Sequence, residues 1–281
     1  MNTSLITSMV SMRALQQKLD IMADNMANLN TTGFKRKEAT FEDVLTNLKE
    51  QPKGFQKNGR LSPLGYDQSY GMKVSQTRLD MTQGPLKETE VPTDMALEGP
   101  GLFEVKAGNT TAYTRDGSFQ LSFDKQDPDM VYLTTKDGYY LQWNNGGTAE
   151  PVHMSAKATF TVNAEGQMTV TVPGEQPTVH QLKLVRAVKP QLLEQAGDNL
   201  YRIPNGVDNT QGQVIRDVGP LDRTSDNQPL ITVRQQFLEQ SNVNLANEMT
   251  EVLQVQRAYQ LNARAISSSD MMASLTNNLR G

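Results

Sequence analysis

The chain has 281 residues, of which 37% are hydrophobic and 21% charged, a composition typical of a folded protein at the polar end of the globular range. Its 27 basic and 31 acidic residues are interleaved and give a net charge of −4, which excludes the concentrated basic surface of a nucleic-acid-binding protein. The absence of cysteine excludes disulfides and thiolate chemistry, and the histidines, His153 and His180, lie far apart, so we expect no catalytic residue, metal or cofactor.

The first thirty residues follow the seven-residue repeat of a helix that buries one apolar stripe. The two series of this repeat, offset by three residues, are Leu5, Met12, Leu19 and Met26, and Leu15, Met22 and Leu29. Gly33 follows a polar Asn and Thr segment and is suited to the left-handed cap that ends a helix. The sequence therefore predicts an N-terminal helix with a coiled-coil-like seam.

The same segment has neither the basic region nor the continuous apolar core of a cleaved secretory signal peptide. In the whole chain, no apolar run approaches the roughly 18 residues that a membrane span requires. We therefore expect no stable membrane insertion, and any export of the protein leaves its N-terminus intact.

The middle of the chain changes from the helical period to short alternating segments. Residues 35–80 fit neither pattern and contain several glycines, so we expect an extended connector with a short helical start around Phe41 to Leu48. From residue 81 onward, apolar and polar residues alternate between turn sequences such as Asp116-Gly117 and Asp137-Gly138. This pattern predicts a mainly antiparallel β domain over residues 81–230.

The C-terminal segment returns to the helical period and contains neither Gly nor Pro from Leu238 to Leu279. We expect the helix to begin near Ser241 or Asn242. Its predicted seam consists of Leu238, Leu245, Met249, Val252, Gln256, Tyr259 and Ile266. The seam amides, Asn242 and Gln256, either fix the register of neighbouring helices, as buried amides do, or face a water-filled channel.

These elements together predict an α+β protein with a discontinuous helical domain formed by both termini and a β domain inserted between them. The expected divisions are residues 1–34, 35–80, 81–230 and 231–281. A single helix with one apolar stripe is only marginally stable in water. The two seams must therefore pack on each other or on a neighbouring subunit, and the few basic residues of the N-terminal helix disfavour a membrane surface.

Four strings, in order along the chain, resemble signatures of the flagellar rod and hook proteins. The first runs from Ala27 to Lys35 and closes the predicted N-terminal helix; the others run from Thr93 to Phe103, from Tyr113 to Phe119, and from Leu238 to Tyr259. The residues that carry the resemblance are Asn28, Asn30, Thr31, Gly33, Phe34, Asp94, Gly99, Gly101, Asn242, Gln256 and Arg257. One departure is Gln236, which stands where the family often has glycine.

The resemblance implies a structural subunit that polymerises through its terminal helices into a hollow axial tube and transmits torque. It further implies other rod and hook proteins as partners, export by the flagellar type III apparatus, and a location in the basal body. The length fits the proximal-rod and distal-rod members, or a rod–hook paralogue of Gram-positive bacteria, better than the hook protein, which usually carries additional outer domains. A hook-type or rod–hook junction protein is the alternative within the family.

Two alternatives belong to other functional classes. Asp94 and Glu98 are the best carboxylate pair for a cell-wall hydrolase, because glycosidases act with two neighbouring carboxyl groups. Trp143 with Tyr139 and Tyr140 could instead form the stacking platform of a secreted binding module. Neither alternative explains the heptad repeats at the two ends of the chain, so we expect no enzymatic activity.

Overall fold

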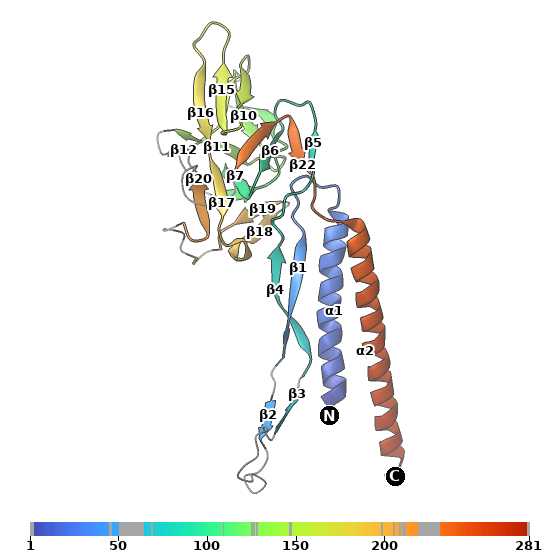
Figure 1. Cartoon of the computed structure of the whole chain (residues 1–281). Coiled ribbons are helices and arrows are strands. Elements are labelled where there is room, and N and C mark those ends of the chain that lie inside the picture. Colours follow the sequence, from blue (N-terminus) through green and yellow to red (C-terminus); the bar gives the residue numbers. More distant parts are fainter. Residues whose placement is uncertain are drawn as a thin grey trace. The chain divides into compact units, whose positions relative to one another are not determined.

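The computed structural model describes residues 3–44, 47–50, 65–68, 70–108, 110–124, 127, 129–145, 148–197, 199–204, 206–207, 209, 212–218 and 231–279. Helix α1 (Thr3–Ala27) opens the chain, helix α2 (Leu245–Leu279) closes it, and strands occupy the sequence between them (Figure 1). The α+β class is therefore confirmed. Within the described ranges, neither helix combines the length and the hydropathy that a membrane crossing demands.

The chain divides into two compact units. The first, here called the helical unit, contains Met1–Met26, Lys37–Arg78 and Asn244–Gly281. The second, the β unit, contains Ala27–Arg36 and Leu79–Val243. Each unit thus combines segments that are remote in the sequence.

Strands accompany the helices in the helical unit. Strand β1 (Lys37–Asp43) pairs with β4 (Met72–Leu79), and β2 (Asn47–Glu50) pairs with β3 (Gly65–Gln68). The expected short helix from Phe41 to Leu48 is wrong, because these two residues lie in β1 and β2. Backbone pairing with a later segment decides the conformation here, and a local helical pattern contains no information about that pairing.

Helix α1 follows the predicted repeat but ends at Ala27, so Leu29 lies beyond the helix. Helix α2 begins later than expected. The Asn244 side-chain oxygen accepts hydrogen bonds from the backbone N–H groups of Ala246 and Asn247, at 3.0 and 3.2 Å, which is the geometry of a helix N-cap. Placing Leu238 on the C-terminal helix is wrong, because it lies in strand β22 (Phe237–Glu239).

The β unit holds the strands from β5 onward and one short 3-10 helix, η2. The remaining bounds are β5 Leu86–Glu88, β6 Met95–Glu98, β7 Gly101–Ala107, β8 Thr110–Thr114, β9 Gln120–Phe123, β10 Met130–Thr134, β11 Tyr140–Asn145, β12 Thr148–Pro151, β13 His153–Ser155, β14 Thr159–Val162, β15 Gln167–Thr171, β16 Thr178–Leu182, β17 Leu184–Ala187, η2 Pro190–Leu192, β18 Glu194–Gly197, β19 Leu200–Arg202, β20 Ile215–Val218 and β21 Thr232–Gln235.

Among the described strands, fourteen form one network whose longest path is β14-β15-β16-β11-β7-β8-β19-β18. Neighbours along this path, for example β7 and β8 or β15 and β16, are antiparallel, as the alternating sequence pattern predicted. Two separate ribbons join the ends of the unit, because β21 pairs with β6 and β22 pairs with β5. The segment that leads to α2 is therefore held by the first strands of the unit.

The main core of the β unit packs between these strands. Phe103 and Phe119 meet edge to face with ring centroids 5.3 Å apart, and Met95, Leu97 and Leu141 are fully buried around them. Burying side chains of this size contributes about 1.5–3 kcal/mol each. The core thus gives the β unit a source of stability that does not depend on the helices.

Candidate functional site

The predicted stripe of α1 is covered by its own unit. Leu15 and Met22 are buried, and Leu5, Met12, Leu19 and Met26 are half-buried. Leu15, Leu19 and Met22 pack in one cluster with Val252, Val255, Ala258 and Tyr259 of α2 and with Met72 of β4. The two terminal helices, which run side by side in Figure 1, therefore contact each other within one chain.

The covered face of α2 is only half of the predicted seam. Val252, Tyr259 and Ile266 are half-buried, whereas Leu245, Met249 and Gln256 of the same predicted seam are exposed. The second covered series lies one position earlier than Met249 and Gln256, at the buried residues Glu248, Val255 and Ser269 and the half-buried Asn262. Helical spacing permits either series beside Val252, and the packing of α1 selects the one that includes a glutamate.

A polar contact explains the glutamate. The Asn25 amide, buried on α1, donates to Glu248 on α2 at 3.4 Å and to the backbone carbonyl of Lys37 at 2.9 Å. The Asn25 oxygen accepts from the backbone N–H of Lys37, also at 2.9 Å. One asparagine thus connects both helices and the start of β1 within the helical unit, which no apolar pattern could have predicted.

The outer face of α2 carries a set of apolar side chains between 39% and 65% exposed. This set, here called the α2 outer surface, consists of Leu245, Met249, Leu253, Leu261, Met271, Met272 and Leu275. Gln256 and Arg257 of the family motif lie exposed on the same helix. An apolar surface of this extent marks a site of interaction with another molecule.

The motif strings meet in the β unit around a buried ionic cluster. The Lys35 ammonium donates to Glu239 at 2.7 Å, the Arg115 guanidinium donates to the other oxygen of Glu239 at 2.5 Å, and all three side chains are about 1% exposed. Glu239 also accepts from the backbone N–H of Gly84 at 2.8 Å. Lys35, Arg115 and Glu239 come from the first, third and fourth motif strings.

Backbone groups complete this cluster. Lys35 donates to the carbonyl of Thr82 at 2.7 Å, and Arg115 donates to the carbonyls of Leu97, at 2.7 Å, and of Gly101. Burial lowers the pKa of the Lys35 ammonium below its ordinary 10.5; the attraction of Glu239 opposes this shift and the Arg115 guanidinium adds to it. Such a cluster is stable only with all its partners, because an unpaired buried charge is costly.

The remaining motif residues shape the same region. Gly33 has a φ of 70°, and a Cβ at this position would lie 2.5 Å from the backbone nitrogen of Asp116, so only glycine fits without displacing the backbone. Phe34 is buried beside it. The Asp116 carboxylate accepts from the Thr32 hydroxyl at 2.8 Å. These contacts hold the segment after α1 against the loop between β8 and β9.

Asn242, predicted to lie on the helix seam, is instead a connector within the β unit. Its oxygen accepts from the backbone N–H of Arg36 at 2.7 Å, and its amide donates to the carbonyls of Asp80 and Thr82 at 2.9 and 3.1 Å. The seam prediction is wrong for this residue, which precedes α2. Three segments that lead toward the helical unit are thereby joined at one side chain.

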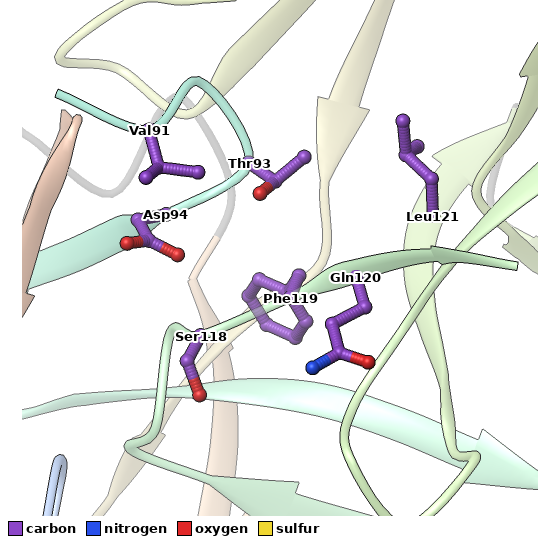
Figure 2. Close-up of a pocket in the computed structure, with 7 residues that line it drawn as sticks. All are labelled: Val91, Thr93, Asp94, Ser118, Phe119, Gln120 and Leu121. Carbon is purple, nitrogen blue, oxygen red and sulfur yellow. The ribbon is translucent and has the colours of Figure 1, made fainter. Parts of the chain in front are cut away.

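Asp94 and Glu98, the two carboxylates of the hydrolase alternative, have different surroundings. Asp94 lines a cleft of about 410 Å³ with Val91, Thr93, Ser118, Phe119, Gln120 and Leu121, which Figure 2 shows. Glu98 does not line this cleft; it forms an ion pair with Arg234 at 2.8 Å and accepts from the Thr232 hydroxyl at 2.9 Å. The two carboxyl groups therefore do not face one common substrate space.

The aromatic residues of the binding-module alternative do not form an open stacking platform. Trp143 is 3% exposed, and its ring stacks on His180 with a centroid distance of 3.9 Å. Tyr140 packs edge to face on Tyr132, and Tyr139 packs against the main core. The tryptophan is thus a core residue, and its face is already covered by a side chain of the same unit.

The ionic cluster is the feature that the sequence predictions missed. Lys35, Arg115 and Glu239 stand inside the motif strings, but none of them is among the residues that the sequence predicts to carry the function. The sequence did contain a signal, because each of the three charged residues stands next to apolar or glycine positions: Lys35 follows Gly33-Phe34, Arg115 lies two residues before Gly117, and Glu239 follows Phe237-Leu238. Charged residues in such surroundings are rarely buried unless they are paired.

Comparison with known families agrees with the four strings. Three family descriptions match successive parts of the chain: "Flagella basal body rod protein" matches residues 5–35, "Flagellar hook protein FlgE/F/G D1 domain" residues 96–171, and "Flagellar basal body rod FlgEFG protein C-terminal" residues 234–279. The first and third contain the terminal helices, and the second begins in the β unit at β6.

Full-length relatives give the same picture. The flagellar basal-body rod protein FlgG of Borreliella burgdorferi is 32% identical over 100% of this chain and 99% of that protein. FlgG of Buchnera aphidicola subsp. Schizaphis graminum is 33% identical over 96% of both chains. The flagellar hook-basal body complex protein FlhP of Bacillus subtilis is 30% identical over 99% of both chains.

Proposed function

The chain belongs to the FlgG type of flagellar basal-body rod proteins, and we propose that it joins its neighbours in the rod through the outer face of its terminal helices. It is a structural subunit of the basal body. The finer proposal is that many copies polymerise into a hollow axial tube that transmits torque. We further propose that both termini form one core domain, and that the chain divides into residues 1–34, 35–80, 81–230 and 231–281.

The α2 outer surface carries this proposal. The covered face of α2 already packs on α1, so its opposite face remains for other subunits. Fully burying a leucine or methionine side chain contributes about 1.5–3 kcal/mol. Covering the seven partly exposed apolar residues of this surface with a helix of a neighbouring subunit would therefore be strongly favourable, whereas their exposure to water is not.

The names of the relatives support a position in the rod. They are named as basal-body rod proteins and as a hook-basal body complex protein, and they align over nearly their whole length. We infer that this chain occupies the rod, with a rod–hook junction as the alternative. Its partners are then copies of itself and other axial proteins, and it reaches them through the flagellar export apparatus with its N-terminus uncleaved.

The test is a charge placed on the α2 outer surface. Leu261 is 65% exposed in the single chain, so Leu261→Asp leaves the folded monomer unchanged. Once covered by a neighbouring subunit, the aspartate is desolvated without a partner, at a cost of several kcal/mol per contact. We expect Leu261→Asp protein to be exported but absent from purified basal bodies, and the cells to be non-motile.

Two controls separate assembly from folding. Leu261→Met keeps the apolar surface at the same position and should incorporate normally. Glu175→Lys changes a charge in an exposed turn of the β unit and should also be tolerated. Leu261→Asp protein found in basal bodies at the wild-type level would refute the proposed role of this surface.

A further inference from the structure

Strand β9 carries exposed apolar side chains on the same face of its sheet that covers the core. Leu121 pairs with Leu133 and Phe123 with Val131 across the β9–β10 ladder. Directly opposite residues in an antiparallel pair point to the same face of the sheet. Leu133 and Val131 are buried in the main core, yet Leu121 is 48% and Phe123 is 65% exposed. The apolar face therefore extends one strand further than the described residues that cover it.

The neighbourhood of β9 is suited to a contact. Leu121 forms one wall of the cleft in Figure 2, and Val91, 45% exposed, forms another. Among the described strands, β9 pairs with β10 alone, so it stands at an edge of the sheet. Val91, Leu121 and Phe123 are here called the β9 patch. An apolar edge strand left open in this way is a recognised site of association.

The charge beside the β9 patch is acidic. The turn sequence that follows β9 has three aspartates, Asp124, Asp127 and Asp129, against one lysine. Asp127 and Asp129 are exposed. A partner surface that combines apolar side chains with a positive charge would therefore fit this patch.

The same β unit presents such a surface elsewhere. Val188 and Leu192, beside and within the short helix η2, are 48% and 38% exposed, and the exposed Lys189 lies between them in the sequence. These three residues are here called the η2 patch. Because the two patches are different parts of one chain, a contact between them joins copies head to tail. Contacts of this kind propagate into rings or helical filaments.

We propose that the β9 patch of one subunit contacts the η2 patch of a neighbouring copy of this chain in the assembled rod. The inference rests on the proposed function, which brings many copies together through their helices. It adds a second contact, between β units, with a defined polarity. The apolar side chains supply the contact area, and Lys189 faces the aspartates that follow β9.

Cysteine cross-linking tests this contact, and the chain's lack of native cysteine makes the reaction specific. The full-length double variant Leu121→Cys/Leu192→Cys is assembled in cells, and purified basal bodies are treated with a short bismaleimide and separated under denaturing conditions. We expect the monomer band to be lost into a ladder of dimers, trimers and longer species. The control variant Leu121→Cys/Val179→Cys, with the second cysteine on exposed β16, should remain monomeric.

The outcomes distinguish the two proposals. Basal bodies that contain the double variant but give no ladder would overturn the β9–η2 contact and leave the proposed function intact. Dimers formed by Leu121→Cys alone, or a product with the mass of a complex with another axial protein, would likewise overturn it. Wild-type protein absent from basal bodies would refute the proposed function itself, and the contact with it.

Charge reversal provides an independent readout. Lys189→Glu should lower the amount of protein retained in basal bodies, because it places like charges at the contact. Adding Asp127→Lys and Asp129→Lys should restore retention. A Lys189→Glu loss that the compensating pair leaves unchanged would contradict the assignment of the η2 patch as the partner surface.

Discussion

Glu239 is the residue whose removal should most damage the β unit. It is the single acidic member of a cluster with two cations, and its oxygens accept from Lys35, Arg115 and the backbone of Gly84. In Glu239→Ala, both cations keep their buried positions and lose the counter-charge. The backbone N–H of Gly84 loses its acceptor as well.

The expected loss follows from these contacts. Removing one partner of a buried ion pair costs about 3–5 kcal/mol, and an unsatisfied buried N–H adds about 1–3 kcal/mol. We therefore expect Glu239→Ala to lower the free energy of unfolding by at least about 4 kcal/mol, a large part of the roughly 5–15 kcal/mol typical of a domain. At about 2–4 °C per kcal/mol, the melting temperature falls by at least about 8 °C.

The assay uses the chain's single tryptophan. Trp143 is buried in the β unit, so its fluorescence reports the unfolding of this unit during thermal or urea denaturation. The matched control is Glu194→Ala, which removes a glutamate from an exposed ion pair with Arg202 at 3.5 Å. Surface pairs of this kind contribute about 0–1 kcal/mol. If Glu239→Ala is no less stable than Glu194→Ala, the buried cluster does not hold the unit together.

Three further expectations follow from the same structure. Gln236 has a φ of 66°, a left-handed conformation that glycine adopts without strain, so Gln236→Gly should raise the free energy of unfolding by about 0.5–1 kcal/mol; an unchanged or lower value in urea titration would contradict this. Burial raises the pKa of Tyr113 to about 12, above its unfolded value of about 10. The contribution of the neutral Tyr113 hydroxyl to the free energy of unfolding is therefore complete below pH 10 and is lost as the pH rises to 12. Tyr113→Phe should remove about 2–3 kcal/mol of this dependence of the free energy of unfolding on pH, measured by denaturation at several pH values. The double variant Asp94→Asn/Glu98→Gln should release peptidoglycan fragments at the same background rate as wild type, and activity present in wild type and abolished in the variant would establish a hydrolase.

The sequence by itself determined the elements whose cause is local. The seven-residue repeat of α1 predicts a helix because its apolar side chains recur on one face, and Thr3–Ala27 confirms it. Alternation and turn residues predicted antiparallel strands from residue 81 onward, and segments such as Thr159–Val162 confirm them. The motif strings identified the family for the same reason: each is a short run of neighbouring residues.

Tertiary structure decided what depends on contacts between remote segments. Helical spacing allowed two buried series on α2, and the packing of α1 selected Glu248 over Met249 because Asn25 provides a polar partner. Asn242 and Leu238 lie outside the helix, contrary to the prediction, because hydrogen bonds hold Asn242 and strand pairing holds Leu238 in the β unit. The burial of Lys35 depends on Glu239, 204 residues later in the chain. A charged residue is predicted to be exposed unless its distant partner is known.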